Sequence, residues 1–137
     1  FKVVNELVGP YLMDSKGGLR SQNLPEEQCP VILVSGLGSP DSFESSIKTV
    51  KNLKVLEHLR YPDHFNYEDK DFEHIEGKRR EMGASYICTT LKDAVKMSRD
   101  DDLRSKLLVF DVEIKFENKS DEDIFESKLL NVLGRRY

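Results

Sequence analysis

Three short segments of the chain combine residue types that handle anions or protons. SGLGSP (Ser35–Pro40) holds two glycines between two serines, and RYPDHFNY (Arg60–Tyr67) sets an Asp-His pair among aromatic residues and a proline. TTLKDAV (Thr89–Val95) follows two threonines with a lysine and an aspartate. Glycine turns that open a helix favour anions, and histidine is the side chain whose pKa best suits proton transfer near neutral pH. The available chemistry is therefore anion binding and proton transfer.

Each of these segments ends or follows a run of residues typical of a β-strand. Four such runs occur: CPVILVSG (Cys29–Gly36), KVLEHL (Lys54–Leu59), ASYICTT (Ala84–Thr90) and KLLVFDVEIKF (Lys106–Phe116). Helical patterns follow them, at SPDSFESSIKTVKN, Glu68–Met82, LKDAVKMS and Ser120–Gly134. Strands that alternate with helices predict an α/β fold, here a small open, mainly parallel sheet of about four strands with helices on both faces.

Local signals predict where the helices begin. Ser39 is a candidate N-cap, and Pro40 suits the first turn of the helix that follows. Asn66 and Asp69 are the expected capping pair of the second helix. The apolar stripe of this second helix is expected to contain Phe72, Ile75 and Met82.

The first 28 residues do not fit a strand–helix unit. They contain two short strand-like pieces divided at Gly9-Pro10, then Gly17-Gly18 and a polar stretch. We expect residues 1–28 to form a β-ribbon and linker arm. This arm should contribute little to the core and exchange its amides faster than the sheet. Residues 29–137 are then the α/β domain.

Composition limits the classes of protein that fit. The chain has 137 residues with 38% hydrophobic and 34% charged residues, which is typical of one folded domain. Its net charge of −4 disfavours a nucleic-acid partner. The residues given show no signal-peptide pattern, so none is expected, and no apolar run is long enough to span a bilayer. Cys29 and Cys88 lack metal-ligand spacing and are expected to be buried thiols, so no metal site is predicted.

In an open parallel sheet, ligands bind beyond the carboxyl ends of the strands, and all three segments lie there. The residues alone leave two interpretations of each segment open. Gly36–Ser39 either approach an anion or form a plain turn, and Lys92 either reaches an anion or lies in a helix capped by Thr90 and Asp93. His64 is either a proton-transfer group or structural. His58 and His74 have no evident partners, and we interpret both as structural.

Read in order, VILVSGLGSPDSF, EHLRYPDHFNYEDKD and YICTTLKDAVKM resemble the C-terminal part of the tetraacyldisaccharide 4'-kinase family. The resemblance runs from about Val31 to Met97 and continues more weakly to Leu133. The P-D-H loop followed by T-T-x-K-D is the specific combination. Three positions depart from the family pattern, namely Tyr61, Phe65 and Leu91, and the last two argue against a polar role for Phe65 or Leu91.

The resemblance implies an enzyme that transfers the γ-phosphoryl group of ATP, with Mg²⁺, to the 4'-hydroxyl of a lipid disaccharide 1-phosphate. It implies catalysis by His64 together with an aspartate of a P-loop half, and a β-ribbon-like hinge to which residues 1–28 would belong. From their place at the carboxyl end of a strand, we expect Gly36, Leu37, Gly38 and Ser39 to form a nucleotide-side loop. Asp63 and Lys92 are expected to support His64. The sequence contains no G-x-x-x-x-G-K-[ST] motif.

The P-loop half is therefore expected outside this chain, which begins at Phe1 and reads as part of a longer protein. Alone, the chain is expected to be soluble and inactive, and to bind no cofactor tightly. The full-length enzyme is expected on the cytoplasmic side of a bacterial inner membrane, which it would contact only through the P-loop half. The alternative is a free-standing α/β module that binds a nucleotide or phosphorylated ligand without catalysis.

Overall fold

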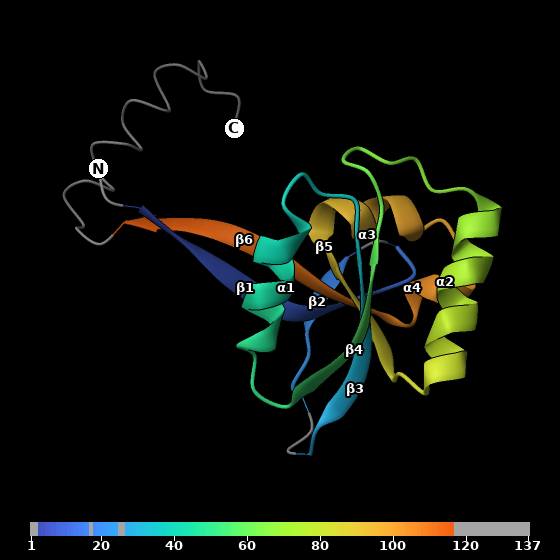
Figure 1. Ribbon diagram of the computed structural model, residues 1–137, viewed down its shortest axis with the longest axis horizontal. Coiled ribbons are helices and arrows are strands. Elements are labelled where there is room, and N and C mark those ends of the chain that lie inside the picture. Colours follow the sequence, from blue (N-terminus) through green and yellow to red (C-terminus); the bar gives the residue numbers. More distant parts are fainter. Residues whose placement is uncertain (1–2, 17, 25–26, 117–137) are drawn as a thin grey trace. The chain divides into compact units, whose positions relative to one another are not determined.

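The computed structural model describes residues 3–16, 18–24 and 27–116 as a sheet with helices packed against it (Figure 1). Its strands are β1 (Val3–Met13), β2 (Leu19–Ser21), β3 (Cys29–Ser35), β4 (Leu53–Arg60), β5 (Tyr86–Thr90) and β6 (Leu107–Phe116). Its helices are α1 (Pro40–Lys48), α2 (Asp69–Met82), α3 (Leu91–Met97) and α4 (Asp101–Arg104). The helix expected at Ser120–Gly134 lies outside the described residues.

The sheet has the strand order β2-β1-β6-β5-β3-β4. The pairs β3–β4, β3–β5 and β5–β6 are parallel, and β1 pairs with β2 antiparallel. The predicted α/β class and mainly parallel sheet are confirmed. The sheet has six strands and not about four, because β1 and β2 join it beyond β6.

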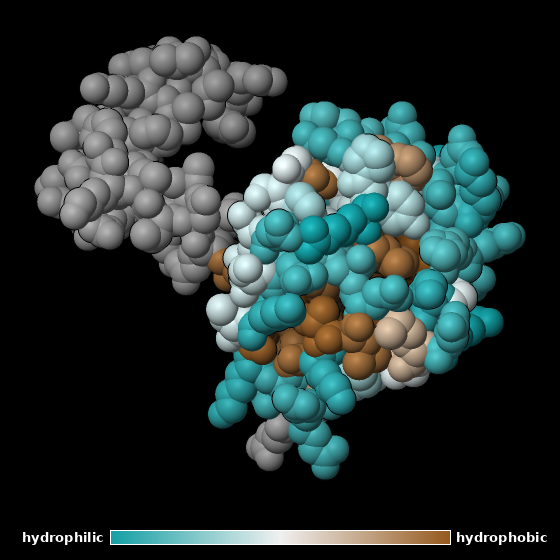
Figure 2. Space-filling model, viewed as in Figure 1, coloured by the Kyte–Doolittle hydropathy of each residue, from teal (hydrophilic) through white to brown (hydrophobic). Residues whose placement is uncertain are grey.

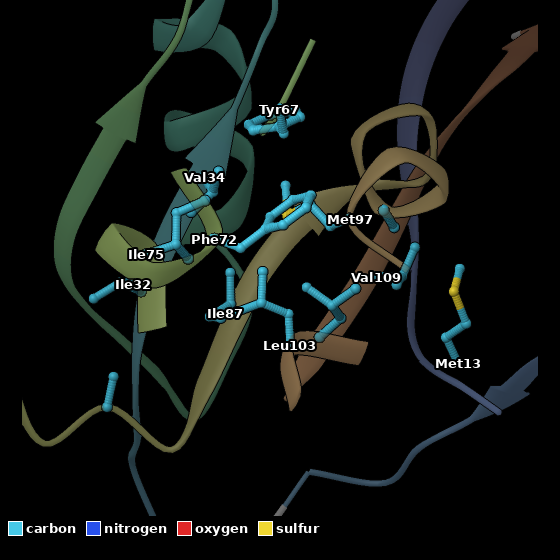
Figure 3. Packing of buried hydrophobic residues seen from close by; sticks show 13 residues of the cluster. Met13, Ile32, Val34, Tyr67, Phe72, Ile75, Ile87, Met97, Leu103 and Val109 are labelled. Carbon is cyan, nitrogen blue, oxygen red and sulfur yellow. The ribbon is translucent and has the colours of Figure 1, made fainter. Parts of the chain in front are cut away.

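Helices cover both faces of the sheet, as predicted. Figure 1 shows α1 and α2 on opposite sides of β3 and β4. Ile32 and Val34 of β3 belong to one buried cluster with side chains of α2, α3 and α4, whereas Val31 and Leu33 alternate to the other face. Phe72 lies centrally in this cluster, beneath Tyr67 (Figure 3). Cys29 and Cys88 are buried free thiols, as expected.

The N-terminal residues that precede β3 form more regular secondary structure than the sequence predicts. β1 is one strand that continues through Gly9 and Pro10, so the predicted division into two short pieces is wrong. Gly9 has a φ of +142° and packs so closely against β6 that an added Cβ would lie 2.8 Å from the carbonyl oxygen of Val109. Met13 is buried in the core cluster and the partly buried Tyr11 packs against it, so this part of the N-terminal region contributes to the core.

The chain divides into two compact units. One comprises Phe1–Val8 and Val112–Tyr137, and the other comprises Gly9–Asp111. All three segments that the sequence singled out belong to the second unit.

Helix starts follow local hydrogen bonds that the sequence indicated only in part. Ser39 is the N-cap residue of α1, but its hydroxyl pairs with that of Ser42, 2.8 Å away, and not with a backbone N–H. The capping box of α2 is formed by Glu68 and Asp71, so the predicted Asn66–Asp69 pair is wrong. Of the predicted stripe, two residues are buried and Met82 is 36% exposed.

The strand at the edge of the sheet, β4, carries the second of the three segments. Figure 2 shows a largely hydrophilic face with hydrophobic residues gathered near its middle, in the area of β4. Val55, Leu56 and Leu59 of this strand are only half-buried. β4 has a strand neighbour on one side only, and the loop that follows it begins with a backbone hydrogen bond to the end of β3.

Candidate functional site

The three segments converge at the carboxyl ends of three neighbouring parallel strands. β3 leads into Gly36–Ser39, β4 leads into Tyr61–Glu68, and β5 leads directly into α3. The backbone N–H of Tyr61 donates to the carbonyl of Ser35 over 2.8 Å, which joins the first two segments where they leave the sheet. The three loops that the sequence placed at this edge of the sheet are therefore adjacent.

A buried carboxylate connects all three segments. Asp93, which is fully buried, accepts hydrogen bonds at Oδ2 from the backbone N–H of Gly36 (3.1 Å) and from the hydroxyl of Thr90 (2.8 Å). Its Oδ1 accepts from the hydroxyl of Tyr67 (3.2 Å). Burial, reinforced by Asp93, raises the pKa of Tyr67 and keeps the phenol a donor.

His64 is displayed at the tip of a tight turn. The N–H of Phe65 donates to the carbonyl of Pro62 over 3.1 Å, and His64, the third residue of this turn, has a left-handed φ of +59°. Such a conformation is uncommon outside glycine, although histidine is among the residues enriched there. The imidazole is 76% exposed, and its Nε2 lies 3.6 Å from Oδ2 of Asp63. An exposed histidine in this conformation at a loop tip is a candidate functional residue.

The supporting residues predicted from the sequence lie beside His64. Lys92 at the start of α3 places Nζ 3.4 Å from Oδ1 of Asp63. A Cβ added at Gly38 would lie 3.5 Å from Oδ2 of the same carboxylate. The structure thus gathers His64, Lys92 and Gly38 around the carboxylate of Asp63, which is about half exposed to solvent.

The four residues of the glycine turn differ in exposure. Gly36 is buried, Leu37 is half-buried, and Gly38 and Ser39 are exposed. A Cβ at Gly36 would lie 3.1 to 3.2 Å from oxygen atoms of Asp93, Pro62 and Tyr67, which explains why a glycine suits this position. Only the second half of the turn is open to a ligand.

Aromatic rings fix the base of the His64 turn. The ring of Tyr61 lies 4.8 Å from that of Phe65 and 5.2 Å from that of Tyr67, measured between centroids. Two cations hold the backbone of the same loop: Lys96 donates to the carbonyl of Phe65 over 2.9 Å, and Arg99 donates to that of Tyr67. The rigid groups around the histidine therefore restrain the loop.

Two features of this region were not predicted from the sequence. One is that Asp93 accepts hydrogen bonds from residues outside its own helix. The other is a network at His58, for which no partner was expected: Nε2 lies 2.7 Å from the hydroxyl of Ser35, and Nδ1 lies 3.0 Å from Oε1 of Glu44 in α1. A pairing of such distant residues leaves no local signal in the sequence.

The ionisation of His58 follows from its surroundings. Burial lowers its pKa below the ordinary value, despite the opposing hydrogen bond with Glu44. Because a carboxylate only accepts, Nδ1–H donates to Glu44 and the neutral Nε2 accepts the hydroxyl proton of Ser35. Ser35 is fully buried, so this network braces α1 against the end of β3 and does not present a nucleophile.

We expect this network to make the stability of the chain pH-dependent. The depressed pKa means that the unfolded chain binds the His58 proton at higher pH than the folded chain does. The free energy of unfolding should therefore fall as pH drops below about 6.5, by at most about 1.4 kcal/mol per pH unit for one group. Arg60 of β4 opposes protonation, whereas Glu44 and Asp41 of α1 favour it.

Urea unfolding of the 137-residue chain at pH 7.5 and pH 5.5 measures this effect. His58→Gln should flatten the difference between the two pH values, whereas His74→Gln, at an exposed position of α2, should preserve it. Equal pH dependence in the wild type and in His58→Gln would contradict the assignment.

Within the described ranges, no group of three His, Cys, Asp or Glu side chains is placed to hold a metal ion. No helix of the part that the structure describes is both long and apolar enough to cross a bilayer.

Comparison with known proteins identifies the family. A family model described as tetraacyldisaccharide-1-P 4'-kinase matches residues 7–133. The chain is 38% identical over 96 residues to a tetraacyldisaccharide 4'-kinase of Halothermothrix orenii, a match that covers 66% of this chain and 25% of that protein. It is 33% identical over 126 residues to a namesake from Rickettsia akari, covering 92% of this chain and 34% of that protein.

A further relative, the tetraacyldisaccharide 4'-kinase of Elusimicrobium minutum, is 33% identical over 97 residues, which is 69% of this chain and 25% of that protein. No solved structure gave a significant match. The chain thus spans about a quarter to a third of the length of the curated relatives it matches. The family match covers the strands, the glycine turn, the His64 turn and the start of α3, and the chain belongs to the tetraacyldisaccharide-1-P 4'-kinase family.

Proposed function

We propose that this chain forms the C-terminal part of a tetraacyldisaccharide 4'-kinase. The complete enzyme would transfer the γ-phosphoryl group of ATP to the 4'-hydroxyl of a lipid disaccharide 1-phosphate. The relatives carry this enzyme name and are three to four times as long as the matched region. We assign the P-loop, and with it most of the nucleotide contacts, to a part of the enzyme outside this chain, with residues 1–28 as the connecting arm.

The exposed position of His64 on its turn is the observation that carries this proposal. Its imidazole is 76% exposed on a left-handed turn, next to the open half of the glycine turn. A histidine held this way can meet a reacting group brought by another part of the enzyme. The surrounding aromatic rings and the cations Lys96 and Arg99 restrain the loop so that little freedom is lost on that encounter.

In the proposed reaction, the 4'-hydroxyl oxygen forms a bond to the γ-phosphorus while the bond from that phosphorus to the bridging oxygen of ADP breaks. The hydroxyl proton must leave as this happens. We assign its acceptance to His64 acting with an aspartate of the P-loop part. Lys92 and Asp63 would set the charge beside the imidazole, and Gly38 and Ser39 would bring backbone close to the nucleotide.

Magnesium is expected to neutralise phosphate charge in this reaction. Among the described residues, no group of three His, Cys, Asp or Glu side chains is placed to hold a metal ion, and the sequence lacks the P-loop motif whose serine or threonine binds Mg²⁺. We therefore place the Mg²⁺ ligands with the P-loop part. The complete enzyme would work on the cytoplasmic side of a bacterial inner membrane, which it would contact through the P-loop part.

The proposal predicts that the complete enzyme and the 137-residue chain differ sharply in phosphoryl-transfer activity. With γ-labelled ATP and the lipid disaccharide 1-phosphate, the complete enzyme should label the acceptor. The purified 137-residue chain should show no transfer, because the phosphate-binding loop lies elsewhere. Labelling by the 137-residue chain alone would refute the assignment of parts. ATP binding by this chain, with no transfer by the complete enzyme, would favour the non-catalytic binding module.

The glycine turn offers a second test. A side chain at Gly38 meets only Asp63, at an ordinary contact distance of 3.5 Å, so Gly38→Val should fold normally. In the complete enzyme it should raise KM for ATP roughly tenfold if the backbone there approaches the nucleotide. Steady-state kinetics and a melting curve of the same sample measure both properties. A large fall in melting temperature with unchanged KM would make the turn purely structural.

A further inference from the structure

The carboxylate of Asp93 does more than cap its own helix. The cap of α3 requires only the hydroxyl of Thr90, which accepts from the N–H of Asp93 over 3.2 Å. The carboxylate also binds Gly36, which is 57 residues away, and Tyr67, which is 26 residues away. These two bonds leave α3 and reach the other two loops of the site.

Each of the two partners leads directly to a part of the site. Gly36 begins the glycine turn, whose open half starts two residues later. Tyr67 follows the His64 turn, and its ring lies 5.2 Å from that of Phe65 in an edge-to-face arrangement. Phe65 is the residue whose N–H closes the turn. The position of His64 is therefore linked to Asp93 through Tyr67 and Phe65.

Other contacts also join these loops: Tyr61 donates to Ser35, and Lys96 and Arg99 donate to carbonyls of the His64 loop. The Lys92–Asp63 pair is nearly half exposed, and an ion pair of this kind typically contributes under 1 kcal/mol. The bonds to Asp93 are buried, and a bond between a buried carboxylate and a neutral donor is stronger and more directional. Because Gly36 has no side chain, the carboxylate can approach its backbone closely.

We propose that Asp93 is a positioning residue that ties the Gly36 turn, the His64 loop and the start of α3 into one rigid unit. This inference rests on the proposed function for its catalytic readout. Without the hydrogen bonds to Asp93, the fold would persist, but the distance between His64 and the glycine turn would no longer be fixed. An error of about 1 Å in such a spacing lowers turnover roughly a hundredfold.

Asp93→Asn is the direct test, because it keeps size and shape while turning one acceptor oxygen into a donor. In the complete enzyme we expect kcat to fall roughly ten- to a hundredfold with KM for ATP within about threefold of the wild type. Asp69→Asn, at an exposed position of α2, is the matched control and should match the wild type. Tyr67→Phe removes a single bond and should give a smaller loss of kcat, which provides a second variant if Asp93→Asn does not fold.

A double-variant cycle separates positioning from a general loss of structure. If Asp93 acts through His64, adding Asp93→Asn to His64→Ala should lower kcat little further. Effects that multiply, or a wild-type kcat in both Asp93→Asn and Tyr67→Phe, would overturn the inference.

Amide resonances of the 137-residue chain distinguish failure of this inference from failure of the proposed function. Asp93→Asn should shift the amides of Gly36 and Phe65, whereas Asp69→Asn should leave both in place. If they shift but His64→Ala keeps wild-type kcat, the tie stands and the catalytic role of His64 fails. If neither amide shifts in Asp93→Asn or Tyr67→Phe, the tie itself is wrong, whatever the activity.

Discussion

His64→Ala in the complete enzyme is expected to lower kcat roughly ten- to a thousandfold, the range typical of a group that assists proton transfer. The imidazole is exposed and its nearest charged neighbour is Asp63, so its removal leaves no cavity in the core. Folding should therefore be unaffected, and KM for ATP should change little. Steady-state kinetics with the lipid acceptor, alongside a melting curve, measures both quantities.

His64→Gly sharpens this prediction, because it separates catalysis from conformation. A left-handed residue with a Cβ costs about 1 kcal/mol relative to glycine, so the glycine variant should be at least as stable as the wild type. It should nevertheless be as impaired as His64→Ala. His74→Ala, on the exposed side of α2, is the control and should keep wild-type kcat. Unchanged kcat in both His64 variants would return this residue to a structural role.

Gly36→Val is expected to have the largest effect on stability, lowering the free energy of unfolding by roughly 2–4 kcal/mol. Its Cβ would lie within 3.2 Å of three oxygen atoms that belong to Asp93, Pro62 and Tyr67. To admit the side chain, the loop must move and at least one buried hydrogen bond of Asp93 must lengthen. Urea unfolding of the 137-residue chain measures the loss.

Two other glycines provide matched controls for this change. Gly38→Val introduces the same side chain two residues later, where the nearest atom is 3.5 Å away, and should alter stability by under about 1 kcal/mol. Gly77, within α2, has no atom within 4 Å of an added Cβ, so Gly77→Ala should stabilise the chain by about 0.5–1 kcal/mol. A Gly36→Val chain as stable as Gly38→Val would show that the loop adapts and that its close packing is unimportant.

Features that depend on residues close together in the sequence could be predicted from the sequence. β3, β5 and the first half of β6 are mainly apolar runs, and such runs form strands because each apolar residue can be buried without a partner of specific chemistry. The alternation of these strands with helices fixed the class of the sheet. It also placed Gly36, His64 and Lys92 at one edge, since parallel strands point their carboxyl ends the same way. Thr90 as a helix cap was equally local.

Features that depend on distant partners were decided only by the tertiary structure. β1 runs through Gly9 and Pro10 as one strand because β6 supplies a close-packed neighbour, which no local pattern records. The capping box of α2 is a local exception: it begins at Glu68, whose backbone is extended, and not at the predicted Asn66. Asp93 and His58 read as a helix residue and a strand residue. Their roles arise from bonds to Gly36, Tyr67, Ser35 and Glu44, which the fold brings within hydrogen-bonding distance and the sequence keeps 14 to 57 residues apart.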